Sequence, residues 1–236
     1  MDKEERYCPN CGAKVPEGST FCPECGHRLY NESDQRVGER RRGFAEHLNI
    51  GVNVALSHPM VFVPVILSGI ISGALDFYST ETFAFFGLFS LIGVFISFLL
   101  NFASIDMSRD AYFNEQLDLG SSINYVLGRF LSFFLASIVG AILSITIILI
   151  PVVILMFIVM VMDESGIGYS ISRSFNVLRA DLGDIILIIL VSIIGSAILG
   201  FIPLIGGLLL AGLNVVIGLS FIDIYNNYKQ TRSRNF

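Results

Sequence analysis

Charge is the property that this sequence has least of. Only 15% of its 236 residues are Asp, Glu, Lys or Arg, whereas an average soluble domain has roughly 25%. The mean hydropathy is +0.70. No charged residue falls within the stretches 83–105, 130–162 and 185–222. Uncharged runs of this length exclude an ordinary soluble fold for most of the chain and predict helices embedded in a lipid bilayer.

The apolar stretches also lack the ionisable groups on which membrane transport and catalysis depend. Their only strongly polar side chains are Asn101, Asn214 and scattered Ser and Thr. Proton relays and ion-coupled transporters use buried carboxylates, His or Arg, and these stretches contain none. The chain has no Ser-His-Asp candidate, metallohydrolase spacing or phosphate-binding loop. We therefore expect that the protein is not an enzyme.

A signal peptide is a third absence, because the first 57 residues hold no apolar run of the required length. We expect this N-terminal segment to stay in the cytoplasm. It is polar and contains all four cysteines. From Met1 to Asp34 it has four Lys or Arg against seven Asp or Glu, a net charge of 4 − 7 = −3. An acidic segment is poorly suited to a phosphate backbone, so no nucleic-acid partner is expected.

The four cysteines form two motifs of the same pattern, Cys-Pro-x-Cys-Gly, which begin at Cys8 and at Cys22. The gap of two residues lets both thiolates of a motif reach one ion, and the glycine permits the tight turn that follows. Four thiolates in tetrahedral geometry suit Zn²⁺. A segment this short has too little core to fold without metal. The sequence therefore predicts zinc held by four ligands: Cys8, Cys11, Cys22 and Cys25.

Other uses of these cysteines fit the sequence less well than zinc does. Disulfides need an oxidising compartment, and a thioredoxin-like redox site has one such motif in a larger domain. Rubredoxin-like iron uses the same knuckles, but a longer insert between them is expected. His27 follows the second motif, and we interpret it as a surface residue rather than a fifth candidate ligand. Residues 7–29 resemble a zinc ribbon with all four ligands in place, which implies a small domain over residues 1–30.

Residues 31–42 are polar and end in three consecutive arginines at 40–42. We interpret this segment as a linker with a juxtamembrane basic cluster. Such a cluster favours the cytoplasmic side of a membrane, and specific recognition of anionic lipid is the alternative role.

The remaining body, residues 43–228, shows one order of features three times. Each unit begins with an amphipathic pattern at helical spacing and continues with an apolar hairpin that ends on an aspartate. The units are 43–106, 118–163 and 168–223, and their closing aspartates are Asp106, Asp163 and Asp223. We predict an all-α polytopic membrane protein with about six transmembrane helices, arranged as three amphipathic-helix-plus-hairpin repeats behind an N-terminal zinc ribbon.

Charge also predicts the topology of this body. The expected outer turns contain no Lys or Arg, and the tail 229–236 is basic. The positive-inside rule then places both termini in the cytoplasm, in a multi-pass protein of the cell membrane. The middle hairpin has only 33 residues from Phe130 to Met162, which is short for two spans of roughly 20. One long tilted helix is the alternative, and it would move Arg173 and Arg179 to the outside.

Arg173 and Arg179 lie on the amphipathic segment of the third unit. As topology signals, both would extend towards the headgroups of the bilayer. Arg173 could in addition pair with one of the closing carboxylates and hold the repeats in register. The candidate partners are Asp106, Asp163 and Asp223.

The strings 169–179 and 202–206 resemble those of a known family. It is the membrane domain found beside glycerophosphodiester phosphodiesterases and in many uncharacterised multi-helix proteins. The likeness is best over residues 163–228 and looser over 43–162. The catalytic barrel of that family is a separate domain that this chain lacks, so the resemblance implies membrane architecture and no activity. Zinc-ribbon heads on such bodies are common in small prokaryotic, notably archaeal, membrane proteins.

Two functions remain open from the sequence. The first is an accessory or scaffold protein of the bilayer, whose zinc ribbon docks a cytoplasmic protein or a second subunit, including another copy of the chain. The alternative is a transporter or permease-like body for a lipid or small neutral solute, with the zinc ribbon as its regulator. A polar cavity lined by Asn101, Asn214 and serines would favour the alternative, whereas a dry bundle would favour the first.

Overall fold

The computed structural model describes residues 6–7, 14–15, 42–78, 83–202 and 205–233. The chain divides into two compact units, Met1–Arg41 and Arg42–Phe236. In the first unit β1 (Arg6–Tyr7) pairs with β2 (Lys14–Val15) in antiparallel register, with Tyr7 opposite Lys14. The four predicted metal ligands lie outside the described residues.

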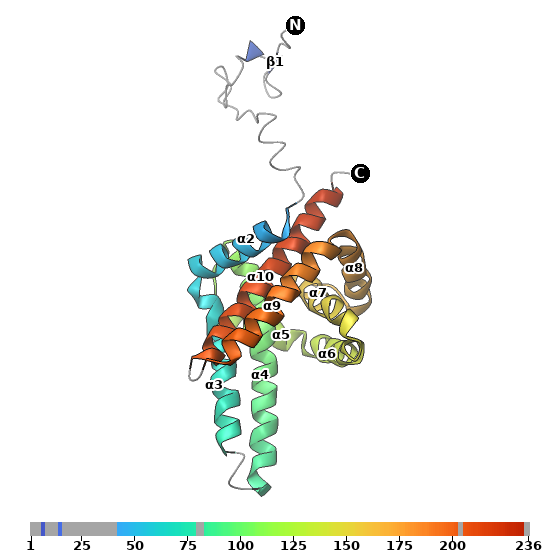
Figure 1. Ribbon diagram of the computed structural model, residues 1–236. Helices are drawn as coiled ribbons and strands as arrows, with labels where there is room; N and C mark the ends of the chain where they lie inside the picture. Colours follow the sequence, from blue (N-terminus) through green and yellow to red (C-terminus); the bar gives the residue numbers. More distant parts are fainter. Residues whose placement is uncertain (1–5, 8–13, 16–41, 79–82, 203–204, 234–236) are drawn as a thin grey trace. The chain divides into compact units, whose positions relative to one another are not determined.

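The described part of the second unit is entirely helical, as predicted (Figure 1). Three short helices each precede a pair of apolar helices, so the expected order of elements occurs three times. Two 3₁₀ turns interrupt this order, at Pro59–Phe62 and Ile147–Leu149. The α-helices described in this unit are α2 (Phe44–Ser57), α3 (Val63–Tyr78), α4 (Phe83–Tyr112), α5 (Leu119–Gly128), α6 (Phe130–Ser144), α7 (Ile150–Met162), α8 (Ile167–Ala180), α9 (Leu182–Gly200) and α10 (Gly206–Ser233).

Local sequence explains several helix boundaries. Pro59 has no N–H for a helical hydrogen bond, and α2 ends just before it, with α3 turned by 97°. Asp118 caps α5, since its carboxylate accepts the backbone N–H groups of Gly120 and Ser121 at 3.1 Å. Pro151 stands in the first turn of α7, where its missing N–H costs nothing.

The protein is a multi-pass membrane protein by the length and apolarity of its helices. Three of the described helices are long and apolar enough to cross a bilayer, in the segments Ser90–Tyr112, Leu182–Gly200 and Gly206–Arg232. Each bent pair, α2 with α3 and α5 with α6, could count as one more span, which makes five at most.

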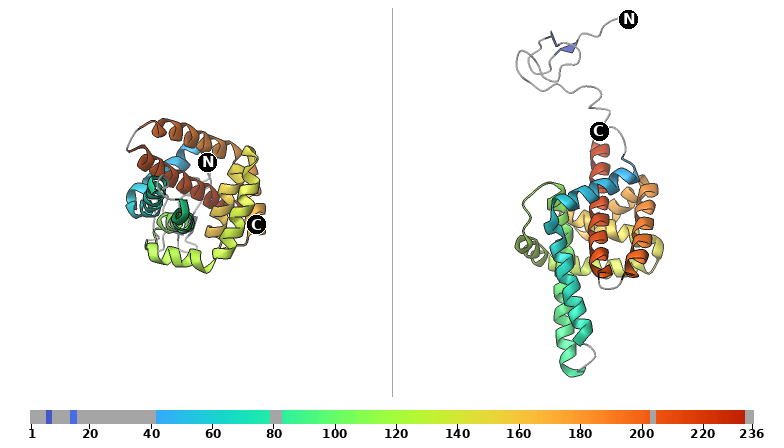
Figure 2. Two further views of the ribbon diagram at one scale, coloured as in Figure 1. Left: turned by 90° about the horizontal axis from the view of Figure 1, so that it is seen from below. Right: turned by 60° about the vertical axis from the view of Figure 1, so that its left-hand side comes forward.

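The three to five candidate spans among the described residues are fewer than the six or so that the sequence predicts. The middle hairpin accounts for most of the difference. α6 has 15 residues and α7 has 13, which at 1.5 Å per residue gives about 22 and 20 Å. A bilayer core is roughly 30 Å thick, so neither helix is long enough to cross it. By contrast, α3 and α4 form a hairpin that extends beyond the other helices of this unit (Figure 2).

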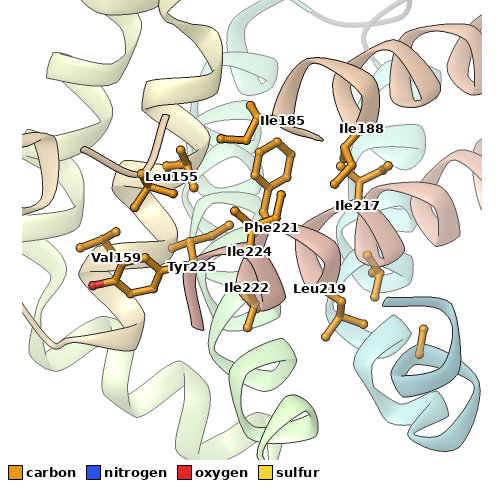
Figure 3. Packing of buried hydrophobic residues seen from close by; sticks show 14 of the residues in the cluster. Leu155, Val159, Ile185, Ile188, Ile217, Leu219, Phe221, Ile222, Ile224 and Tyr225 are labelled. Atoms are coloured by element: carbon orange, nitrogen blue, oxygen red, sulfur yellow. The ribbon is translucent and has the colours of Figure 1, made fainter. Parts of the chain in front are cut away.

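α7 is the most deeply enclosed helix, because side chains all around it are buried. Leu155 and Val159 pack with α9 and α10 in one cluster (Figure 3). Met156 and Met160 pack with α4 and α6 in a second cluster. α9 contributes Ile185 and Ile188 to the first cluster, while most of its apolar surface is left exposed. In a bilayer, such exposed apolar surface is covered by lipid.

Each short helix packs against the last helix of a hairpin other than its own. α5 packs on α4, α8 on α7, and α2 on α10. The contact of α2 with α10 is close at Gly51, where an added Cβ would lie 2.6 Å from the carbonyl oxygen of Val216 and 2.5 Å from Ser220 Oγ. A larger residue at Gly51 would therefore push the two helices apart.

We predict that the turn between α6 and α7 stays inside the bilayer, since neither helix is long enough to carry it across. Single cysteines at Ser79, Thr146 and Asn227, in a cysteine-free chain, are treated in intact cells with a membrane-impermeant thiol reagent. Ser79 should react from outside, and Asn227 only after the cells are opened. Strong outside labelling at Thr146 would mean that the middle hairpin crosses the membrane, and outside labelling at Asn227 would contradict the cytoplasmic C-terminus.

Candidate functional site

Asp223, near the end of α10, is a carboxylate with no exposed surface. Its Oδ1 accepts hydrogen bonds from Arg42 Nη1 and from the hydroxyl of Tyr112, both at 2.5 Å. Nδ1 of His47 donates to Oδ2 at 2.6 Å. Asn226 in turn donates to the Tyr112 hydroxyl oxygen at 3.0 Å. Burial of a charge is costly unless such partners compensate it, and here Arg42, His47 of α2 and Tyr112 of α4 supply them.

Arg42, the last residue of the predicted linker, is the first residue of the second unit. Burial opposes its positive charge, but the carboxylate of Asp223 and the hydroxyl of Tyr112 outweigh this, so the pKa of Arg42 is raised above its ordinary value. The guanidinium therefore stays charged and holds the start of the body against α10. Phe44 N donates to Asp184 Oδ1 at 2.8 Å, which ties the same end of α2 to α9.

Asp163 closes the middle hairpin, and its carboxylate also accepts hydrogen bonds from α10. Lys229 Nζ donates to its Oδ1 at 2.7 Å, and the hydroxyl of Tyr225 donates to Oδ2. Tyr169 of α8 adds a longer hydrogen bond to Oδ2 at 3.3 Å. The carboxylate thus joins the end of α7 to α8 and α10.

Asp106 closes the first hairpin and is 3% exposed. Its main partner comes from its own helix, since Arg109 Nη2 lies 2.9 Å from Asp106 Oδ1. Arg109 also contacts Asp110 at 2.7 Å and donates to the carbonyl oxygen of Val161 at 3.4 Å.

The C-terminal carbonyl groups of α7 need partners because a helix leaves its last four carbonyls unbonded. Two arginines provide them from other elements. Arg109 reaches Val161, and Arg129 reaches the carbonyl oxygens of Met160 at 3.3 Å and Ser165 at 2.8 Å. Cations at this position also oppose the negative end of the helix dipole.

The contacts of Arg173 differ from the predicted ones. Its guanidinium lies over the ring of Tyr228, 4.9 Å from the centroid, and no ion pair with Asp106, Asp163 or Asp223 occurs among the described residues. Burial opposes its charge, but nearby tyrosine hydroxyls outweigh this and raise its pKa. Arg179 is exposed in the last turn of α8. Whether Arg173 holds the repeats in register stays a prediction.

A groove beside Asp163 brings several of these groups together. It has a volume of about 670 Å³ and is lined by charged and polar side chains from the α7–α8 connection, α8 and α10, including Asp163, Glu164, Arg173 and Lys229. The two carboxylates and the two basic side chains in this lining have opposite charges that cancel.

Sequence reasoning identified the three carboxylates but missed their partners. Only the closing aspartates follow from the pattern of the chain. Their donors come from positions up to 181 residues away, as with Arg42 and Asp223. The one local signal is the group of tyrosines near the helix ends, a position that is also typical of an interfacial aromatic belt. Two of them, Tyr112 and Tyr225, donate to the carboxylates of Asp223 and Asp163.

A recess lies between α3, α4, α7 and α10, within the apolar part of the body. Its volume is about 250 Å³. Its walls are mostly aliphatic, and its polar groups are Asn101, Ser104, Ser108 and Asn214. A second recess of about 360 Å³ on the α6 side shares Asn101, Ile105 and Phe157 with the first. The polar residues singled out in the sequence thus do line a cavity.

Comparison with known proteins bears on the first unit alone. A protein-family model described as a zinc-ribbon domain matches residues 7–29. Comparisons with curated proteins and with solved structures find no significant match to the chain. The zinc-ribbon match implies a structural metal, with zinc as the expected ion.

The donor set and the strand pairing both fit such a metal. β1 ends immediately before Cys8 and β2 begins three residues after Cys11, so the connection of the hairpin contains the first cysteine pair. Four cysteines would hold the ion and contribute free energy to folding. The described residues themselves contain no cluster of three or more His, Cys, Asp or Glu that could bind one.

We predict that Asp223→Asn strongly destabilises the body, because Arg42 would stay charged without its carboxylate. Removing one partner of a buried ion pair costs roughly 3–5 kcal/mol. The measurement is thermal unfolding in detergent. Asp118→Asn is the matched control, since Asp118 is exposed and asparagine caps a helix equally well. Adding Arg42→Gln to Asp223→Asn should recover part of the loss. Equal melting temperatures for Asp223→Asn and Asp118→Asn would show that the pair of Arg42 and Asp223 contributes little to stability.

For Arg173 we expect a smaller effect. Arg173→Gln removes a cation–π contact worth about 0.5–1 kcal/mol, whereas Arg179→Gln removes an exposed charge. The melting temperature of Arg173→Gln should therefore lie below that of Arg179→Gln by at most about 2–4 °C. Equal, small losses for both variants would leave only the topology role for Arg173.

Proposed function

We propose that this protein is a non-enzymatic accessory or scaffold protein of the cell membrane, whose cytoplasmic zinc ribbon docks a protein partner or a further subunit. The observation that carries the proposal is the division of the chain into two compact units, a small metal-organised head and a separate helical body. The head is too small for chemistry of its own, and its role is best explained as recognition.

The contacts within the body support a holding role. Asp223 joins α10 to α4 and α2, and Asp163 joins α7 to α8 and α10. Movement of one hairpin against the others would separate buried charges from their partners. Alternating access in transporters requires such movement, so a body joined in this way is better suited to remain in one conformation.

The charge of the N-terminal segment bears on the expected partner. Residues 1–34 carry a net charge of 4 − 7 = −3, and thiolates bound to metal make this segment more acidic, whereas the end of the linker at 40–42 is basic. Charge complementarity then favours a partner with a basic surface for residues 1–34 and argues against nucleic acid. The resemblance of the body to the membrane domain beside glycerophosphodiester phosphodiesterases agrees with this proposal, because that domain is itself separate from the catalytic barrel.

Affinity capture of the full-length protein from native membranes tests the proposal. Intact protein should retain about one zinc per chain and a specific cytoplasmic partner. Cys8→Ser and Cys25→Ser should lose both, since a site with three thiolates holds zinc weakly. Asn10→Ala is the matched control, because it changes the same motif and leaves the four ligands in place. A partner that is retained by both cysteine variants would refute docking through the zinc ribbon.

The recess with Asn101 and Asn214 favours a second candidate, a permease-like role for a lipid or small neutral solute. The recess has polar groups at the depth of the hydrocarbon and no ionisable group in its walls. Binding of an uncharged molecule there is the minimum that this role requires.

A further inference from the structure

Four polar side chains face one recess in the apolar part of the body without meeting one another. Asn101 Nδ2 donates to the backbone carbonyl of Ser97 at 2.7 Å, one turn earlier in α4. Its amide oxygen and second N–H have no hydrogen-bond partner among the residues that the structure describes. The side chains of Asn214, Ser104 and Ser108 make no hydrogen bond within the described residues. The recess therefore contains both donors and acceptors that are available to a ligand.

Asn101 and Asn214 line the recess but are themselves exposed, so their depth in a surrounding bilayer would make their lack of partners costly. Asn101 is 11 residues before the end of α4 at Tyr112, and Asn214 is nine residues before Asp223. At 1.5 Å per residue these groups lie about 16 and 14 Å below the layer of buried ion pairs, near the middle of a bilayer core of roughly 30 Å. An amide in hydrocarbon without a hydrogen-bond partner costs several kcal/mol. Polar residues in this position mark functional sites.

The walls of the recess determine the class of ligand. The polar groups converge from α4 and α10, and the rest of the lining is aliphatic or aromatic. No Asp, Glu, Lys, Arg or His lines either recess. A charged head group would be buried without a counter-charge, which is strongly unfavourable. The volume of about 250 Å³ corresponds to roughly eight water molecules, enough for a small head group.

The second recess provides room for an apolar chain. It meets the first at Asn101, Ile105 and Phe157, and its other walls come from α4, α6 and α7. Phe157 packs edge-on against Phe102 at 5.1 Å and forms part of the boundary between the two spaces. An amphipathic molecule could place its head group between the asparagines and its chain along the Phe157 side or into the lipid.

We infer that Asn101 and Asn214 form the head-group site for one uncharged amphipathic lipid, a long-chain molecule with a hydroxyl or similarly neutral hydrogen-bonding head. The inference rests on the recess of the second candidate function and not on transport, because a bound lipid would suit a scaffold equally well. It assigns the two residues a direct contact with the ligand.

Photolabelling of the full-length protein in phosphatidylcholine nanodiscs tests this site. The probe is a long-chain primary alcohol with a diazirine next to its head, and the labelled peptides are mapped by mass spectrometry. Label should concentrate near Asn101 and Asn214 and be displaced by unlabelled alcohol. Asn101→Leu and Asn214→Leu should each lower saturable labelling about tenfold, the loss expected when one or two hydrogen bonds are removed. Asn124→Leu is the control, since Asn124 is exposed on α5 outside both recesses.

The labelling results distinguish a specific site from contact with bulk lipid. Labelling that unlabelled alcohol does not displace would show only contact with bulk lipid and would overturn the inference. So would equal labelling by a probe of the same chain length with a trimethylammonium head, or unchanged labelling of both leucine variants. Melting temperatures of the variants establish that they fold; leucine in place of a lipid-exposed amide should not lower them. Partner capture through the head should be unchanged by Asn101→Leu, so failure of the lipid site and failure of the docking proposal give different results.

Discussion

The structure of the body depends on the cost of burying a carboxylate. Each hairpin ends on an aspartate; Asp106 and Asp223 are buried and Asp163 is partly buried, and a buried charge is stable only when donors surround it. Asp223 and Asp163 obtain these donors from helices distant in the sequence. The ends of α4, α7 and α10 are therefore held together by the requirement for charge compensation, while the apolar cores between them provide non-directional attraction.

The order of helices could be predicted from the sequence because hydrophobic periodicity, prolines and charge-free runs are local properties. The number of spans could not, since it depends on where a helix ends within an apolar run. The run from Phe130 to Met162 carries no charge, but the break around Thr146 leaves two helices that are too short to cross a bilayer. Composition alone does not predict where that break lies.

For the candidate site, the sequence identified the acceptors and not the donors. Asp106, Asp163 and Asp223 stood out because each ends an apolar stretch. Arg42 lies in the predicted linker and His47 in the amphipathic pattern that begins the first unit, and neither pattern predicts a contact with α10. Asn101 and Asn214 were recognised as the polar exceptions in apolar segments. That both line one recess follows from the packing of α4 against α10, which depends on side-chain shapes along the whole interface.

The packing of α2 on α10 also has a consequence for the synthesis of the protein. α2 is the first helix of the body and α10 is the last, so the contact at Gly51 and the pair of Arg42 with Asp223 cannot form until the C-terminal helix has left the ribosome. Contacts between distant parts of a chain form slowly because the intervening loop must first be closed. During that interval α2 and the arginine beside it remain unpaired at the membrane surface. The packing of the body is therefore complete only after α10 has been synthesised. A chain truncated before α10 would leave α2 without its principal packing partner.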